Sequence, residues 1–131
     1  MLSQDTPILI VDDMSDMREF IAMACMELGF RNFAEAPDGT LAWEMISEAW
    51  TPFGLVISDW NMPNCTGIEL LKKVRSDERF QDLPFLLVTS ESAEQKMEEA
   101  RRSRVSGYVV KPFSLDDLRN ELDEAFRKIQ K

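Results

Sequence analysis

The sequence of 131 residues contains no histidine. This absence excludes Ser-His-Asp and Cys-His catalysis, histidine metal sites and a role as a phosphohistidine carrier. Cysteine is scarce as well, since Cys25 and Cys65 lie 40 residues apart and form no Cys-x-x-Cys pair. Such cysteine usage excludes a disulfide scaffold and a cysteine-based zinc site, and it fits a reducing compartment.

Long hydrophobic runs are also absent, and none approaches the ~18 residues that a membrane span needs. Residues 1–5 lack the basic and apolar regions of a signal peptide, so we expect a cytoplasmic protein without membrane insertion. The net charge of -9 argues against nucleic-acid partners, because phosphate backbones repel an acidic chain. With 44% apolar and 30% charged residues, the sequence predicts one compact domain over residues 1–131.

The excess negative charge lies entirely in the first half of the chain. Residues 1–65 hold 11 acidic and 2 basic side chains, whereas residues 66–131 hold 13 of each. A solubilising surface is one interpretation of this asymmetry, and a local acidic site that binds a cation is the other.

Short apolar runs alternate with helical patterns along the sequence. Strands are expected at residues 7–11, 32–36, 53–59, 84–89 and 107–110, and helices at 14–28, 40–49, from Thr66, at 92–104 and from Ser114. Five β-α units in succession require right-handed crossovers and a parallel sheet with helices on both faces. Phe20 is expected on the inward face of the first helix, and Trp60 is expected to be partly exposed.

Polar residues follow the strong strands at the positions where each strand ends. They are Asp12, Asp13, Asp59, Thr89 and Lys111. Each one alone can be explained as a helix cap or an ordinary loop lysine. Parallel strands, however, bring their carboxyl ends to one edge, where α/β sheets form their sites. Clustered carboxylates without histidine or cysteine favour Mg²⁺, and one of them can attack phosphorus as a nucleophile.

The segments around these residues resemble the response-regulator receiver domains of two-component signalling, and above all the stand-alone, CheY-like chemotaxis regulators. The matching segments are ILIVDD (8–13), VISDWNMP (56–63), LVT (87–89) and SGYVVKPF (106–113), and the resemblance continues through the last helix. It implies a flavodoxin-like (βα)5 fold, a doubly wound parallel sheet with strand order 2-1-3-4-5. It also implies a phosphorylated signalling protein rather than an enzyme, with a histidine kinase as phosphodonor.

The resemblance further implies a role for each strand-end residue. Asp59 would be the phosphoacceptor, and Thr89 and Lys111 would contact the phosphoryl group. The implied Mg²⁺ ligands are Asp12, Asp13, Asp59 and the backbone carbonyl of Asn61. The peptide bond between Lys111 and Pro112 is expected to be cis, as is typical of these domains.

The resemblance implies that three further residues control the conformational change on phosphorylation and the lifetime of the phosphoryl group. Tyr108 matches the switch aromatic, and Asn61 and Glu91 match residues that flank the hydrolytic water. Phosphorylation would draw Thr89 toward the new group and let Tyr108 rotate into the vacated space. The surface of the fourth helix, last strand and fifth helix would then change its shape and its partner binding.

This surface departs from the family pattern in its charge. Where chemotaxis regulators present lysines, the sequence has Glu94, Glu121 and Glu124, around an apolar centre of Met97, Tyr108 and Val110. Glu121 and Glu124 are expected to share a helix face opposite the inward stripe. The reversed charge predicts a basic or neutral output partner, and the alternative is a solvated helix face without a partner role.

Several functions remain to be weighed against this one. A monomer that controls a flagellar switch, a regulator of a non-flagellar chemosensory pathway and a phosphate sink are all compatible with the sequence. A haloacid-dehalogenase-like phosphatase would need Asp-x-Asp, where the sequence has Asp59-Trp60-Asn61. A receiver without phosphorylation would lack the acceptor, acid pair or lysine. A flavin site would want a Ser/Thr/Gly-rich loop in place of the acid pair after the first strand.

Overall fold

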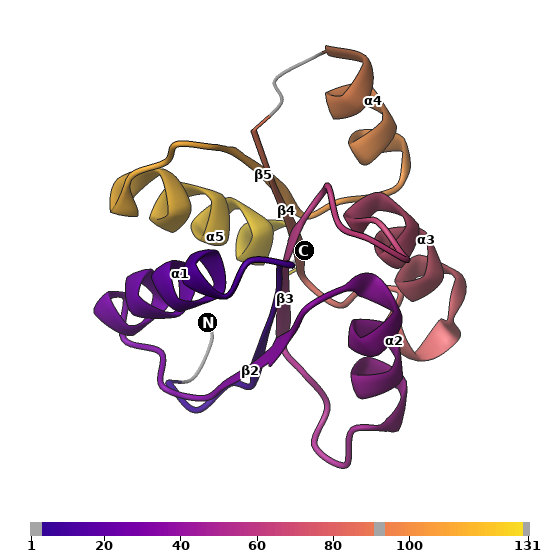
Figure 1. Ribbon diagram of the computed structural model, residues 1–131, viewed down its shortest axis with the longest axis horizontal. Helices are drawn as coiled ribbons and strands as arrows, with labels where there is room; N and C mark the ends of the chain where they lie inside the picture. Colours follow the sequence, from indigo (N-terminus) through magenta and orange to yellow (C-terminus); the bar gives the residue numbers. More distant parts are fainter. Residues whose placement is uncertain (1–3, 91–93, 130–131) are drawn as a thin grey trace.

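The computed structural model describes residues 4–90 and 94–129, which form a parallel five-stranded sheet covered by helices on both faces (Figure 1). In chain order the elements are β1 (Ile8–Val11), α1 (Ser15–Glu27), β2 (Phe33–Ala36), α2 (Gly39–Glu48), β3 (Leu55–Asp59), α3 (Gly67–Ser76), the 3₁₀ turn η1 (Glu78–Phe80), β4 (Phe85–Thr89), α4 (Glu94–Arg102), β5 (Gly107–Val110) and α5 (Leu115–Ile129). None of the helices in this part of the chain has the length and apolar character needed to cross a membrane.

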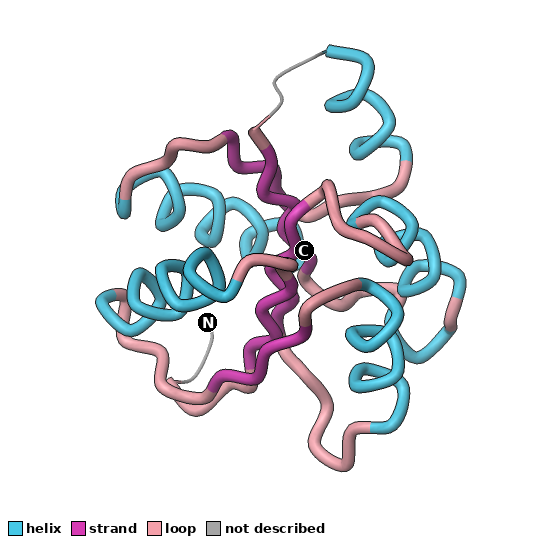
Figure 2. The backbone as a smooth tube through the Cα atoms, in the orientation of Figure 1, coloured by secondary structure: helices cyan, strands magenta, loops and turns pink. Residues whose placement is uncertain are grey.

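The strand order is β2-β1-β3-β4-β5, and every neighbouring pair is parallel. This order confirms the predicted doubly wound (βα)5 topology. Helices α1 and α5 lie on one face of the sheet, and α2 and α3 lie on the other, as Figure 2 shows by the helices on either side of the strands. From β1 the chain adds β2 on one side of the sheet, and it then crosses back to add β3 on the other side of β1. In such sheets a crevice lies at the carboxyl ends of the two strands where the order reverses, here β1 and β3.

Two apolar cores lie on the two faces of the sheet. One packs Leu9, Val11, Val56, Phe85 and Leu87 with residues of α2 and α3, and the other packs Ile8, Ile10, Leu55, Ile57, Leu86 and Val88 with residues of α1 and α5. All of these strand side chains are completely buried. The continuous β-branched and leucine runs therefore reflect strands covered on both faces, as the sequence predicts.

The helix boundaries follow the local signals in the sequence. Gly29 follows α1 with φ of 103°, a left-handed conformation that glycine adopts without a steric penalty. Thr66 and Glu69 form a reciprocal capping box at the start of α3. Ser114 and Asp117 form the equivalent pair at α5, so aspartate serves here in place of the usual glutamate.

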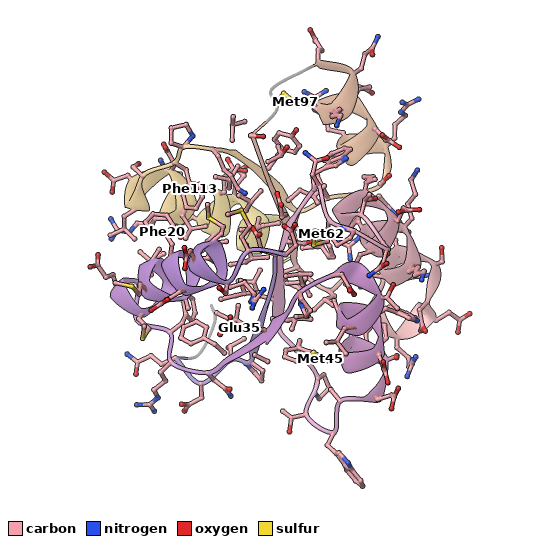
Figure 3. All side chains as sticks on the ribbon, viewed as in Figure 1. Phe20, Glu35, Met45, Met62, Met97 and Phe113 are labelled. Atoms are coloured by element: carbon pink, nitrogen blue, oxygen red, sulfur yellow. The ribbon has the colours of Figure 1, made fainter. Side chains whose placement is uncertain are left out.

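Two expectations for aromatic residues are wrong. Phe20 is 48% exposed instead of inward, and its ring lies 5.6 Å from that of Phe113, which follows β5 (Figure 3). Trp60 is only 4% exposed, because its ring packs in the core beside Tyr108. The burial of Trp60 depends on a neighbour from a distant element, which local periodicity does not reveal.

Candidate functional site

The predicted strand-end residues meet at one edge of the sheet. Asp12 directly follows β1, Asp59 ends β3, Thr89 ends β4 and Lys111 follows β5. The backbone N–H of Lys111 donates to the Thr89 carbonyl at 2.7 Å, which extends the pairing of β4 and β5 to the edge. Parallel register thus places groups that are up to 99 residues apart in the sequence around a single pocket.

Three carboxylates form the floor of this pocket. Asp12, Asp13 and Asp59 each offer an oxygen, and these oxygens all lie within 4.8 Å of one another. The Lys111 ammonium faces them, with Nζ 3.4 Å from Asp59 Oδ1 and 3.6 Å from Asp12 Oδ2. Asp12 and Asp59 are buried, whereas Asp13 is exposed at the entrance.

The buried carboxylates are electrostatically strained in this arrangement. Burial raises the pKa of Asp12, although the Met14 N–H and Lys111 oppose the rise. Burial also raises the pKa of Asp59, with the charge of Asp12 as the second cause. One lysine therefore does not neutralise the acidic floor, and a further cation would favour the ionised form of both groups.

The donor atoms fit a magnesium ion. Asp12 Oδ1 accepts a hydrogen bond from Met14 N at 2.9 Å, but the buried Oδ2 has no hydrogen-bond partner within the described residues. A buried anionic oxygen of this kind is costly unless a cation lies against it. Carboxylate oxygens alone, without histidine or cysteine, are the ligands that Mg²⁺ prefers.

The Asp59 carboxylate is held from one side only. Its Oδ1 accepts hydrogen bonds from Trp60 N at 2.9 Å and from Lys111 Nζ at 3.4 Å. Oδ2 accepts no hydrogen bond within the described part of the chain, so its lone pairs are available to an electrophile. The arrangement orients a carboxylate for nucleophilic attack, with a cation beside it to neutralise incoming oxygens.

Gly67 lets the end of β3 pack closely against the start of α3, which the sequence does not reveal. Its N–H donates to the Trp60 carbonyl at 2.9 Å. A Cβ atom at this position would lie 2.2 Å from the Asp59 carbonyl oxygen. Only glycine therefore allows the start of α3 to approach the backbone of Asp59 this closely.

Other predicted site residues lie near this pocket or outside the described residues. Asn61 is exposed and lies two residues after Asp59. Within the described residues, no contact of its backbone carbonyl indicates that this oxygen binds a metal ion. Glu91 falls in the segment that the structure does not describe. The Lys111-Pro112 peptide bond is cis, as predicted. The roles assigned to Asn61 and Glu91 stay predictions.

The predicted switch aromatic, Tyr108, lies against Trp60, the residue that follows Asp59. Tyr108 is half-buried, and its ring meets the Trp60 ring edge-on, with centroids 6.3 Å apart and planes at 73°. This pair connects the carboxyl end of β3 with the edge strand β5. Because the rings are in contact, a movement of either ring would change the packing at both strands.

One residue of the predicted partner face lies differently from the expectation, and the partner role of the face stays a prediction. Glu94 and Glu124 are exposed, and Met97, Tyr108 and Val110 are half-buried. Glu121 does not lie opposite the inward stripe of α5: it is half-buried, and its Oε1 accepts the Tyr108 backbone N–H at 2.9 Å. Glu121 follows Leu118 by three residues and precedes Ala125 by four, which places it at the border of the buried face.

An apolar hollow of about 380 Å³ opens beside Lys111. It is lined by Met17, Phe20, Ser90, Lys111, Pro112 and Phe113. Met14, Met23 and Met26 are further exposed apolar side chains on or next to α1. Apart from Lys111, sequence reasoning assigned no function to the residues that line this hollow, because Phe20 was expected to face inward.

The fold and the acidic pocket agree with a family comparison. The family model described as the response regulator receiver domain matches residues 8–123 of the chain. The chain therefore belongs to the response regulator receiver domains. These domains bind Mg²⁺ at an acidic pocket, which matches the cluster of Asp12, Asp13 and Asp59.

Within this family the chain is a CheY-like receiver domain, consistent with two-component chemotaxis signalling. It is 46% identical to the chemotaxis protein CheY of Pseudomonas aeruginosa, over 93% of this chain and 97% of that protein. It is 41% identical to CheY-3 of Vibrio cholerae, over 98% and 97% of the two chains. The solved structure of the chemotaxis response regulator CheY4 of Vibrio cholerae superimposes with a TM-score of 0.82 at 30% identity, covering 92% and 98%. CheY-like receiver domains are signalling proteins rather than classical enzymes.

Proposed function

We propose that the protein is a cytoplasmic, phosphorylation-switched response regulator that accepts a phosphoryl group on Asp59 from a histidine kinase. The observation that carries the proposal is the geometry of Asp59. Its Oδ1 is held by Trp60 N and Lys111 Nζ, its Oδ2 is open, and two further carboxylates lie within 4.8 Å. This arrangement supplies a nucleophile, a cation site and a charge-neutralising lysine in one pocket.

The transfer needs only groups that this pocket contains and a phosphodonor. An Asp59 oxygen attacks phosphorus, the bond between phosphorus and the donor imidazole nitrogen breaks, and its electron pair leaves with the imidazole. Lys111 neutralises charge on the phosphoryl oxygens, and the buried Thr89 at the end of β4 donates its hydroxyl to one of them. Asp12, Asp13 and Asp59 would hold Mg²⁺, which when bound would supply further neutralisation of charge on these oxygens. Asn61 and Glu91 then set the lifetime of the phosphoryl group.

The entrance of the pocket suits a protein as the phosphodonor. Met17, Phe20 and Phe113 line the hollow beside Lys111, and the rings of Phe20 and Phe113 lie 5.6 Å apart. Exposed apolar groups of this size are typical of protein contact surfaces. They support docking of a kinase domain next to the acceptor.

Phosphorylation acts on partner binding through α4, β5 and α5. The new group brings about -1.5 to -2 charges to the end of β3. Thr89 moves toward it, Tyr108 shifts against Trp60, and the face with Met97 and Val110 changes its shape. The output partner is a flagellar switch protein or a component of another chemosensory pathway, and a phosphate sink would use the same pocket without an output.

The test is phosphorylation by a small acyl phosphate. The protein is incubated with acetyl phosphate and Mg²⁺, and its intact mass is measured. The wild type should gain one phosphoryl group, and Asp59→Asn should gain none. Asp123→Asn, which changes an exposed aspartate on α5, is the matched control and should be labelled like the wild type. Undiminished labelling of Asp59→Asn would contradict the proposal.

A further inference from the structure

Lys96 reaches from α4 to the residue that follows the acceptor. Its Nζ lies 5.2 Å from the centroid of the Trp60 ring, within the range of a cation–π contact. The ring itself is only 4% exposed, so the ammonium faces an aromatic surface that is largely shielded from water. Shielding strengthens the attraction between a cation and a ring.

The Trp60 backbone connects this contact with the acceptor. Its N–H is shared between Asp59 Oδ1 at 2.9 Å and the Val88 carbonyl at 3.1 Å. Its carbonyl accepts the Gly67 N–H at 2.9 Å. The orientation of the Asp59 carboxylate hence depends on where the Trp60 peptide is held.

Within the residues that the structure describes, helix α4 makes few other contacts with the body of the protein. Ala100 is the one fully buried side chain among the residues of α4. Lys72 of α3 and Glu99 of α4 form an ion pair at 3.1 Å, but both groups are largely exposed and such pairs contribute little. The contact of Lys96 with Trp60 is therefore a principal link between α4 and the acceptor end of β3.

We propose that Lys96 is a positioning residue for phosphoryl transfer. Its ammonium holds the Trp60 ring, and the Trp60 peptide in turn holds Asp59 with Oδ1 engaged and Oδ2 open. This inference deepens the proposed function and rests on Asp59 as the acceptor. A lysine whose stem merely covers the ring would pack equally well without its charge, so substitutions at this position separate the two roles.

The experiment compares Lys96→Gln and Lys96→Arg with the wild type, and uses Lys72→Gln as a matched control. Lys72→Gln removes the same charge and the other α4 tether, but it leaves Trp60 untouched. The initial rate of Asp59 labelling by acetyl phosphate with Mg²⁺ is measured by intact mass. The three indole N–H resonances are recorded by NMR on the resting protein, and that of Trp60 is assigned with Trp60→Phe.

Lys96→Gln should slow labelling about fivefold and shift the Trp60 indole resonance, while the resonances of Trp43 and Trp50 stay in place. Lys96→Arg, which keeps a cation, should remain within about twofold of the wild type, as should Lys72→Gln. The difference should persist in about 0.5 M salt, where long-range attraction of the anionic donor is screened.

The proposal is overturned by an unchanged rate in Lys96→Gln, by an unmoved Trp60 resonance, by equal loss in Lys96→Arg, or by disappearance of the effect in salt. Failure of the wild type to gain a phosphoryl group on Asp59 is a separate result. It would refute the proposed function, and the positioning role that rests on it would fall with it. The indole spectra would then still report whether the Lys96 ammonium holds the Trp60 ring.

Discussion

Asp12 is placed for binding a cation at the expense of stability. Its side chain is 1% exposed, one of its oxygens has no hydrogen-bond partner within the described residues, and burial raises its pKa. A raised carboxyl pKa means that the folded chain holds this proton more tightly than the unfolded chain. The contribution of Asp12 to the free energy of unfolding is therefore largest at low pH. It falls as the pH rises from the ordinary carboxyl pKa of 3.8 through the pKa of the folded state.

Asp12→Asn should consequently stabilise the metal-free protein at neutral pH. We expect the free energy of unfolding to rise by about 1 kcal/mol, because a buried charge is replaced by a neutral group of the same shape. Urea denaturation without Mg²⁺ measures the change, and the variant should lose the stabilisation that Mg²⁺ gives the wild type. Asp116→Asn, at an exposed position of α5, is the control; a variant less stable than the wild type would contradict this interpretation of Asp12.

Gly67 should tolerate no side chain. In Gly67→Ala the new Cβ would meet the Asp59 carbonyl at 2.2 Å, so the start of α3 or the end of β3 must move. Overpacking of this kind costs about 1–3 kcal/mol, measurable as a lower midpoint in urea. Labelling by acetyl phosphate should also slow, since Asp59 itself is displaced. Wild-type stability together with wild-type labelling would refute the close approach.

The strand-end residues could be predicted from the sequence because topology alone brings them together. Once β1, β3, β4 and β5 are recognised as parallel strands, Asp12, Asp59, Thr89 and Lys111 must share an edge. The burial of Trp60 could not be predicted, since it depends on α4 and Tyr108 lying over the ring. Phe20 is a different case, because it stays 48% exposed even with Phe113 beyond β5 beside its ring.

At the scale of elements, α5 closes the exposed edge of the sheet. Among the strands that the structure describes, β5 pairs with β4 alone, and Glu121 of α5 accepts the backbone N–H of Tyr108. This carboxylate lies close enough to β5 that a Cβ at Gly107 would sit 3.0 Å from it. Glu121 thus fixes the strand that carries the predicted switch, rather than forming a solvated rim. The spacing of Glu121 from Leu118 and Ala125 indicates a position at the border of the buried face of α5. The sequence alone does not show that β5 lies beside this border.

Glu121→Ala should destabilise the protein and loosen β5. Removal of the acceptor for the Tyr108 N–H is expected to cost about 1–3 kcal/mol, and hydrogen exchange at this amide should accelerate. Glu121→Gln keeps an acceptor oxygen and should stay close to the wild type in both measurements. Equal exchange rates in Glu121→Ala and the wild type would show that the contact has no such role.

For the molecule as a whole, the charge is unevenly distributed between the two halves of the chain, which differ in the surfaces they contribute. The first half carries the excess acid, which includes the three clustered carboxylates of Asp12, Asp13 and Asp59, and the second half carries balanced charge. On the partner face the exposed acids are Glu94 and Glu124. Charges at the rim of an interface mainly set the encounter rate and exclude wrong partners.

The phosphorylated protein should therefore bind an acidic flagellar-switch peptide weakly and a basic partner surface well. Glu94→Lys combined with Glu124→Lys should increase affinity for the acidic peptide several-fold at low salt, and added salt should reduce the gain. Fluorescence anisotropy of a labelled peptide measures the affinity and its dependence on salt. Tight binding by the wild type that the substitutions leave unchanged would show that these glutamates are only a solvated helix face.

The central claim, that Asp59 is the phosphoacceptor, is tested most directly by locating the phosphoryl group in the wild-type chain. An acyl phosphate on aspartate is reduced by borohydride to homoserine, which peptide mass spectrometry places at a single position. After incubation with acetyl phosphate and Mg²⁺, homoserine should be found at residue 59 and at no other aspartate, and it should be absent when Mg²⁺ is chelated. Homoserine at Asp12, Asp13 or a surface aspartate, with none at residue 59, would contradict the assignment of this pocket.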